Sequence, residues 1–121
     1  VAEDRDADLF VQVGFQHLPH ALAGDGIAVA VAGPLGDDDG AVPWYQGIEM
    51  FMGLKRLGKP VWMLNYNGEK HGLTQRKNRK DWSLRMSQYF DYYLKDAPMP
   101  EWMSKGVPAT EKTLNYGLKL D

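Results

Sequence analysis

The sequence predicts a single α/β domain in which strands alternate with helices. Residues 27–33 have the composition of a strand, helical spacing begins at Pro43, and residues 60–66 are apolar on both faces. A strand of the last kind is typical of a parallel sheet with helices above and below it. Strand, helix, strand and helix over residues 27–95, joined by short connections, predict a βαβα layer structure. A chain of 121 residues suits one such domain.

Two segments predict strands ahead of the first helix. The run LFVQVGFQ, residues 9–16, alternates apolar side chains as a half-buried strand does. The run IAVAVAG, residues 27–33, is small and β-branched, and Gly33 followed by Pro34 is expected to end it.

The first helix is expected to begin near Pro43 and to end before Gly58 and Pro60. Its apolar face is formed, at helical spacing, by Trp44, Ile48, Phe51 and Met52. Gly47 and Gly53 inside it each cost about 1 kcal/mol relative to alanine, which suggests close packing against a neighbouring element.

The second half of the chain predicts a buried strand, a helix and an irregular tail. In residues 60–66, Val61 and Met63 lie on one face of the strand, opposite Trp62, Leu64 and Tyr66. The next helix is marked by Trp82, Met86, Tyr89, Phe90 and Tyr93, and should end before Pro98. The tail from Glu101 has no sustained period, so we expect it to lie over the surface of the domain.

Composition excludes several classes of function. A net charge of −2 gives no general attraction to nucleic acid or to anionic lipid. Zero cysteines exclude disulfides, thiolate zinc sites and a cysteine nucleophile, but do not identify the compartment. No apolar stretch reaches the ~20 residues of a membrane span. We therefore expect neither a nucleic-acid nor a membrane partner, and localisation stays open.

Two loops are expected beyond the carboxyl ends of the strands, where α/β sheets bind ligands. The acidic loop follows residue 33, and the loop NGEKHGL, residues 67–73, contains His71. An aspartate and a histidine at one sheet edge suggest the orienting half of a Ser-His-Asp system. The alternatives are structural: a histidine in a polar loop is usually solvated, and acids before a helix usually cap it or add ~0.3–1 kcal/mol per charge. From the residues alone, the structural alternatives are favoured.

A longer resemblance favours the catalytic interpretation. The run DDDGAVPWYQGIEMFMGLKRLGKPVWMLNYNGEKHGL and the later NRKDWSLRMSQYFDYYLKDAPMPEWM resemble the C-terminal end of the catalytic domain of prolyl oligopeptidase family serine peptidases. The resemblance covers roughly residues 37–110 and implies a partial α/β-hydrolase sheet, its C-terminal βαβα portion, with flanking helices. It divides the chain into a divergent opening of strands and loop, residues 1–36, and the C-terminal part of the peptidase domain, residues 37–121.

The resemblance also assigns site residues. The family's Asp-x-x-Val motif is met by DGAVP, which selects Asp39 as the triad acid and leaves Asp37 and Asp38 as solvated or capping neighbours. The family's Gly-x-x-His loop is met by GEKHG, which selects His71 as the base. The acid precedes the histidine, as in α/β-hydrolases, and the separation of 71 − 39 = 32 residues accommodates one helix and one strand.

The chain departs from the family at the nucleophile. The family's chemistry requires a serine in a Gly-x-Ser-x-Gly turn, but the only serines are Ser83, Ser87 and Ser104, none of them between such glycines. The stretch AGPLGDDDG also inserts residues where the family runs a strand into the acid loop. We therefore expect a C-terminal fragment of a larger peptidase that is inactive alone, so that whether the chain itself is an enzyme stays open. The alternative is a non-catalytic, hydrolase-derived interaction module.

Expected partners follow from this interpretation. The full-length parent would act on a peptide substrate, and the strand of residues 60–66, stripped of its neighbours, would favour a homo-oligomer. No metal is expected, because GDDDG lacks the ligand pattern of a calcium loop and an Asp/His pair provides too few ligands for zinc. No cofactor is expected either, because GDGIAV has Val29 in place of the third glycine of a dinucleotide-binding motif. The basic run RKNRK, residues 76–80, with nearby tyrosines suggests single-stranded nucleic acid, but those tyrosines share the apolar helix face.

Overall fold

The computed structural model describes residues 9–14, 29–36, 38–111 and 113–121. Its elements, in chain order, are β1 (Leu9–Gly14), β2 (Val29–Gly36), α1 (Trp44–Arg56), β3 (Val61–Tyr66), α2 (Arg76–Lys95), α3 (Glu101–Ser104) and the 3₁₀ turn η2 (Ala109–Glu111). The predicted alternation of strand, helix, strand and helix is confirmed by β2, α1, β3 and α2. Phe15, Gln16, Ile27 and Ala28, which belong to the two predicted strands, lie outside the described residues.

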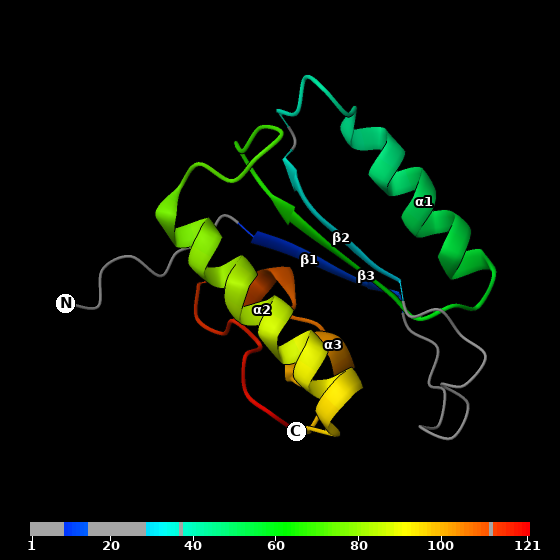
Figure 1. Cartoon of the computed structure of the whole chain (residues 1–121), viewed down its shortest axis with the longest axis vertical. Coiled ribbons are helices and arrows are strands. Elements are labelled where there is room, and N and C mark those ends of the chain that lie inside the picture. Colours follow the sequence, from blue (N-terminus) through cyan, green and yellow to red (C-terminus); the bar gives the residue numbers. More distant parts are fainter. Residues whose placement is uncertain (1–8, 15–28, 37, 112) are drawn as a thin grey trace.

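The strands form one three-stranded sheet in the order β1-β3-β2. Strand β2 runs parallel to β3, with Val29 opposite Val61 and Gly36 opposite Tyr66. Strand β1 runs antiparallel along the other side of β3. Because β2 and β3 are parallel, the loops that follow them leave the sheet at the same end (Figure 1).

Strand β2 does not end at Gly33, as the sequence predicts, but continues to Gly36. Its pairing with β3 is interrupted, since Val31 lies opposite Met63 and Leu35 lies opposite Asn65. Three residues on β2 therefore stand against one on β3. Such an irregularity accommodates Pro34, which has no N–H for a regular ladder. The glycine and proline interrupt the pairing without ending the strand.

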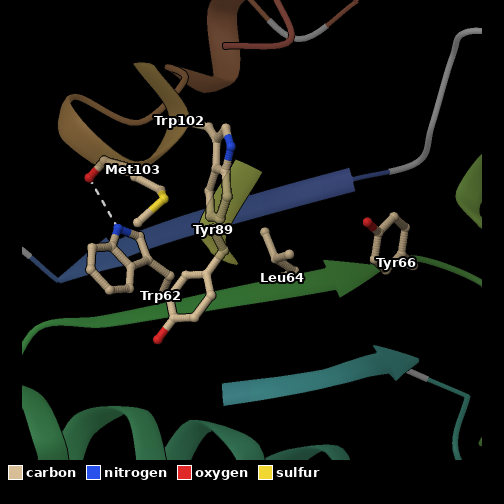
Figure 2. Packing of buried hydrophobic residues seen from close by; sticks show 6 residues of the cluster. All are labelled: Trp62, Leu64, Tyr66, Tyr89, Trp102 and Met103. Carbon is tan, nitrogen blue, oxygen red and sulfur yellow. Dashed lines mark hydrogen bonds between the residues drawn. The ribbon is translucent and has the colours of Figure 1, made fainter. Parts of the chain in front are cut away.

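Strand β3 is the centre of the fold, and all six of its residues are buried, as predicted. On one face Trp62, Leu64 and Tyr66 pack against Tyr89, Trp102 and Met103, and the indole N–H of Trp62 donates to the carbonyl of Met103 at 3.0 Å (Figure 2). On the other face Val61 and Met63 pack against Phe51 of α1. Helices therefore cover both faces. We expected a homo-oligomer because the strand of residues 60–66 would lack its covering elements. That premise is wrong for β3.

Helix α1 buries a narrower face than predicted. Phe51 is buried and Ile48 is half-buried against the same cluster, but Trp44 and Met52 are exposed. The expected close packing at Gly53 is also wrong, because a β-carbon there would have no neighbour within 4 Å, whereas Gly47 is buried. The helix ends as expected: Gly58 has a φ of 69°, and its N–H donates to the carbonyl of Lys55.

Helix α2 begins at Arg76, and its last turn is followed by Asp96 in the left-handed conformation, two residues before Pro98. Tyr89 is buried in the cluster over β3, where Trp82, Met86 and Tyr93 are half-buried, whereas Phe90 is exposed. The predicted apolar face is therefore correct except at Phe90.

The expectation that the tail lies over the surface is wrong for α3. Trp102 and Met103 are buried in the main cluster. The indole N–H of Trp102 donates to Gln88 of α2 at 2.9 Å, and the main chain of Pro100 pairs with that of Leu120. A four-residue helix is too short to show a period in sequence, so the sequence does not predict it.

Among the described residues, α2 is the longest helix, and neither it nor any other is apolar and long enough to cross a bilayer.

Candidate active site

The acidic loop is folded around the carboxylate of Asp39. Its Oδ1 accepts the backbone N–H groups of Ala41 at 2.8 Å and Val42 at 3.0 Å, and its own N–H donates to the carbonyl of Gly36 at 3.2 Å. This is the side-chain-to-backbone turn that aspartate commonly forms. Helix α1 has Pro43 at its N-cap position and no side-chain cap. The alternative that Asp39 caps this helix is therefore wrong.

The histidine loop leaves β3 through a tight turn. The N–H of Glu69 donates to the carbonyl of Tyr66 at 3.3 Å, and Gly68 has a φ of 74°. A side chain is disfavoured at that φ, so the turn requires glycine or a close substitute. Gly72, by contrast, shows no such φ, and a β-carbon there would meet nothing within 4 Å.

The two loops bring Asp39 and His71 together. Nδ1 of His71 lies 3.0 Å from Oδ2 of Asp39, the carboxylate oxygen that the backbone N–H groups leave unused. The Asp39 side chain is only 7% exposed, whereas the imidazole is 68% exposed. With Nδ1 donating to the carboxylate, Nε2 carries the free lone pair, and it has no hydrogen-bond partner among the described residues.

The surroundings of Asp39 favour its ionised form. The hydrogen bond from the N–H of Val42 lowers the pKa of Asp39 most, partial burial opposes it, and the N–H of Ala41 and the imidazole of His71 lower it further. The net result is a pKa below the ordinary aspartate value. The carboxylate is thus an acceptor at neutral pH.

Backbone contacts join the two loops directly. The N–H of Asp38 donates to the carbonyl of Glu69 at 3.3 Å. A β-carbon on Gly36 would overlap the carbonyl group of Glu69, so only glycine permits this approach at the end of β2. Asp38 is exposed, as expected of a solvated neighbour, and Asp37 lies outside the described residues.

A comparison with protein families decides the relationship. The sequence model described as the prolyl oligopeptidase family matches residues 19–97, nearly two thirds of the chain. The chain belongs to the prolyl oligopeptidase family. The match includes both Asp39 and His71. It begins at residue 19, whereas the resemblance seen in the sequence begins at residue 37. Neither the curated proteins nor the solved structures gave a match.

Within the region matched by the prolyl oligopeptidase family, the structure shows a buried carboxylate that the sequence did not single out. Glu69 is fully buried, and it accepts hydrogen bonds from Thr74, Gln75 and Asn78. Burial by itself would raise the pKa of Glu69, but these hydrogen bonds outweigh it and lower the pKa to about 2. In a polar loop a glutamate is ordinarily solvated, and no spacing in the sequence indicates otherwise.

The three serines of this prolyl oligopeptidase family member form hydrogen bonds elsewhere or are exposed, and among the described residues none is bonded to His71. Ser83 donates to the carbonyl of Arg79 within α2, Ser87 is exposed on the same helix, and Ser104 of α3 donates to the carboxylate of Asp121. None of the three hydroxyls hydrogen-bonds to His71 in the part of the chain that the structure describes.

The described residues also show what surrounds the candidate metal ligands and the basic run. Among the described residues, no three histidine, cysteine, aspartate or glutamate side chains gather as metal ligands would. Asn78 of the basic run is buried, and Arg85, five residues beyond the run, is buried in an ion pair with Asp81, with Nε 2.8 Å from Oδ2. Tyr89 lies in the core, where the sequence favoured it, and is not available as a base-stacking platform.

Proposed function

We propose that this chain supplies the acid and the histidine of a Ser-His-Asp triad, as the C-terminal part of the α/β-hydrolase domain of a serine peptidase. The observation that carries the proposal is the 3.0 Å contact between Nδ1 of His71 and Oδ2 of Asp39. It is supported by the family match over both residues and by the parallel pairing of β2 with β3, which places both loops at the carboxyl end of the sheet.

Each side chain would have a defined role. Asp39 holds the proton on Nδ1 of His71, so that Nε2 is the basic nitrogen. Nε2 takes the proton of a serine hydroxyl as the serine oxygen attacks the carbonyl carbon of a peptide bond, and Asp39 stabilises the imidazolium that forms. The imidazolium then gives this proton to the leaving amine as the carbon–nitrogen bond breaks, which leaves an acyl-enzyme.

The nucleophile must come from residues other than the three serines of this chain. None of them lies between the glycines of a nucleophile turn. Acid and base alone cannot form an acyl-enzyme. We therefore propose that the chain is inactive until a serine-bearing segment completes the sheet, and that the substrate of the completed enzyme is a peptide.

A fluorophosphonate probe tests the inactivity. The probe reacts covalently with activated serines, so we expect no labelling of the isolated chain. Stoichiometric labelling of Ser83, Ser87 or Ser104, located by mass spectrometry, would overturn this part of the proposal.

Complementation tests the triad. The chain is refolded with a serine-bearing N-terminal segment of a catalytic domain from the same family, and amidase activity is measured on a chromogenic peptide. We expect activity that is lost with His71→Ala. If the two segments associate but activity is absent, or is unaffected by that substitution, the chain is better described as a non-catalytic interaction module. A homo-oligomer stays a prediction, which light scattering of the isolated chain tests.

A further inference from the structure

We propose that Glu69 is a positioning residue for His71: its carboxylate closes the histidine loop into a ring and holds the imidazole against Asp39. This inference rests on the proposed function, since it matters for catalysis only if His71 is the base.

The ring is defined by hydrogen bonds across the loop. Oε2 of Glu69 accepts both the backbone N–H and the hydroxyl of Thr74, each at 2.8 Å. His71 lies between these two residues in sequence. These hydrogen bonds join the two ends of the segment 69–74. They remove most of the conformational freedom that a glycine-containing loop would otherwise have.

The same carboxylate attaches the ring to the scaffold. Oε1 accepts the N–H of Gln75 at 3.0 Å and the side-chain amide of Asn78 at 2.7 Å, both at the start of α2. The N-cap residue of this helix, Gln75, makes no side-chain capping hydrogen bond. Glu69 therefore satisfies a free N–H group at the helix start and places its negative charge there, where the helix dipole favours it.

The main chain of Glu69 faces the acidic loop. Its carbonyl accepts the N–H of Asp38 and lies against Gly36. One residue is thus tied by its side chain to the ring that carries the base, and by its backbone to the loop that carries the acid. A shift of Glu69 would change the separation of Asp39 and His71.

The arrangement requires a carboxylate. Four donors converge on two oxygens, and each oxygen accepts two hydrogen bonds. Glutamine has the same shape but only one oxygen, so its NH₂ group would face two of the donors. Buried donors left without acceptors destabilise the loop. Glu69→Gln is therefore a conservative change in volume that should release the ring.

The test reads the imidazole itself by ¹⁵N NMR, which distinguishes the Nδ1–H from the Nε2–H tautomer of His71. Spectra are recorded above pH 8 on the whole chain and on its Glu69→Gln and Gln88→Ala variants. Gln88 joins α2 to α3 and to Leu118, away from the loops, so Gln88→Ala controls for general destabilisation. We expect the Nδ1–H tautomer to dominate in the unchanged chain and in Gln88→Ala, and to fall to the ratio of a solvated histidine in Glu69→Gln.

The outcomes separate this inference from the proposed function. If the unchanged chain lacks the Nδ1–H tautomer, the proposed triad geometry fails. If it has that tautomer and folded Glu69→Gln keeps it, the positioning role is overturned and the proposed function stands. If Glu69→Gln does not fold, Thr74→Val decides, because Thr74 is exposed and valine has nearly the same shape. It removes one of the two bonds across the ring, and an unchanged tautomer ratio would then overturn the inference.

Discussion

The backbones of Gly36 and Glu69 are packed so closely that no β-carbon fits between them. A methyl group on Gly36 would overlap the carbonyl group of Glu69 and lie 2.6 Å from the carbonyl oxygen of Lys70. Gly36 is the last residue of β2, and Glu69 follows β3 after a two-residue turn. This approach therefore sets the distance between the loop of Asp39 and the loop of His71.

Gly36→Ala should separate the two loops. Because the obstructing atoms are backbone and cannot rotate away, we expect the free energy of unfolding to fall by about 1–3 kcal/mol. The hydrogen bond from Asp38 to Glu69 should open at the same time. Urea unfolding measures the first effect, and amide hydrogen exchange at Asp38 measures the second.

Gly40→Ala is the matched control, because Gly40 lies in the same loop and a β-carbon there would meet nothing within 4 Å. Its unfolding free energy should stay within about 0.5 kcal/mol of the unchanged chain. An equal loss in both variants would mean that the acidic loop tolerates no side chain anywhere, and that the contact with Glu69 is not the cause.

Asp39→Asn should reverse the tautomer of His71. The N–H groups of Ala41 and Val42 require an oxygen as their acceptor, so the asparagine must turn its NH₂ group toward Nδ1. Nδ1 then accepts, the proton moves to Nε2, and the imidazole can no longer take a proton from serine. We expect the Nε2–H tautomer in ¹⁵N spectra, and a loss on the order of 10⁴ in kcat once the enzyme is complemented. Persistence of the Nδ1–H form would argue against this orientation of the side chain.

Glu69 should make the chain sensitive to acid. Its pKa is lowered from 4.5 to about 2 in the folded state, so protonation favours the unfolded chain. The stabilisation is fully present above pH 4.5 and is lost as the pH falls through about 2, and it amounts to about 3 kcal/mol. Urea unfolding between pH 6 and 2.5 should therefore show a flatter pH dependence in Glu69→Gln than in the unchanged chain. Gln88→Ala, which removes no titratable group, should shift the curve without flattening it.

Strand β3 and helices α1 and α2 could be predicted from the sequence because each has a strong local signal. Strand β3 is apolar on both faces, and α1 is followed by Gly58, which has a positive φ. The extension of β2 to Gly36 could not be predicted, because Gly33 and Pro34 are ordinary stop signals that only pairing with β3 overrides. The burial of Trp102 depends on long-range contacts with α2 and β3, for which a four-residue helix gives no sign.

Some residues of the candidate site could be predicted from the sequence and others could not. The motifs around Asp39 and His71 single out these two side chains, and the structure places them 3.0 Å apart; their catalytic roles stay a prediction. The contribution of Glu69 could not be read from sequence, since a buried carboxylate is recognised by the donors around it. Those donors, from Thr74 to Asn78, converge only when the loop and α2 have folded.

Trp102 should be essential to the fold, although it lies in a segment that looks like a surface tail. Its side chain is fully buried between α2 and β3, its indole N–H donates to Gln88, and the guanidinium of Arg85 lies 5.5 Å from its ring centroid. Truncation leaves a large cavity and an unpaired acceptor, so we expect Trp102→Ala to lower the free energy of unfolding by about 3–5 kcal/mol.

Leu94→Ala on the exposed side of α2 is the control and should change the free energy of unfolding by less than about 0.5 kcal/mol. Both are measured by urea unfolding, and a loss below 1 kcal/mol for Trp102→Ala would mean that α3 does not contribute to the core in solution.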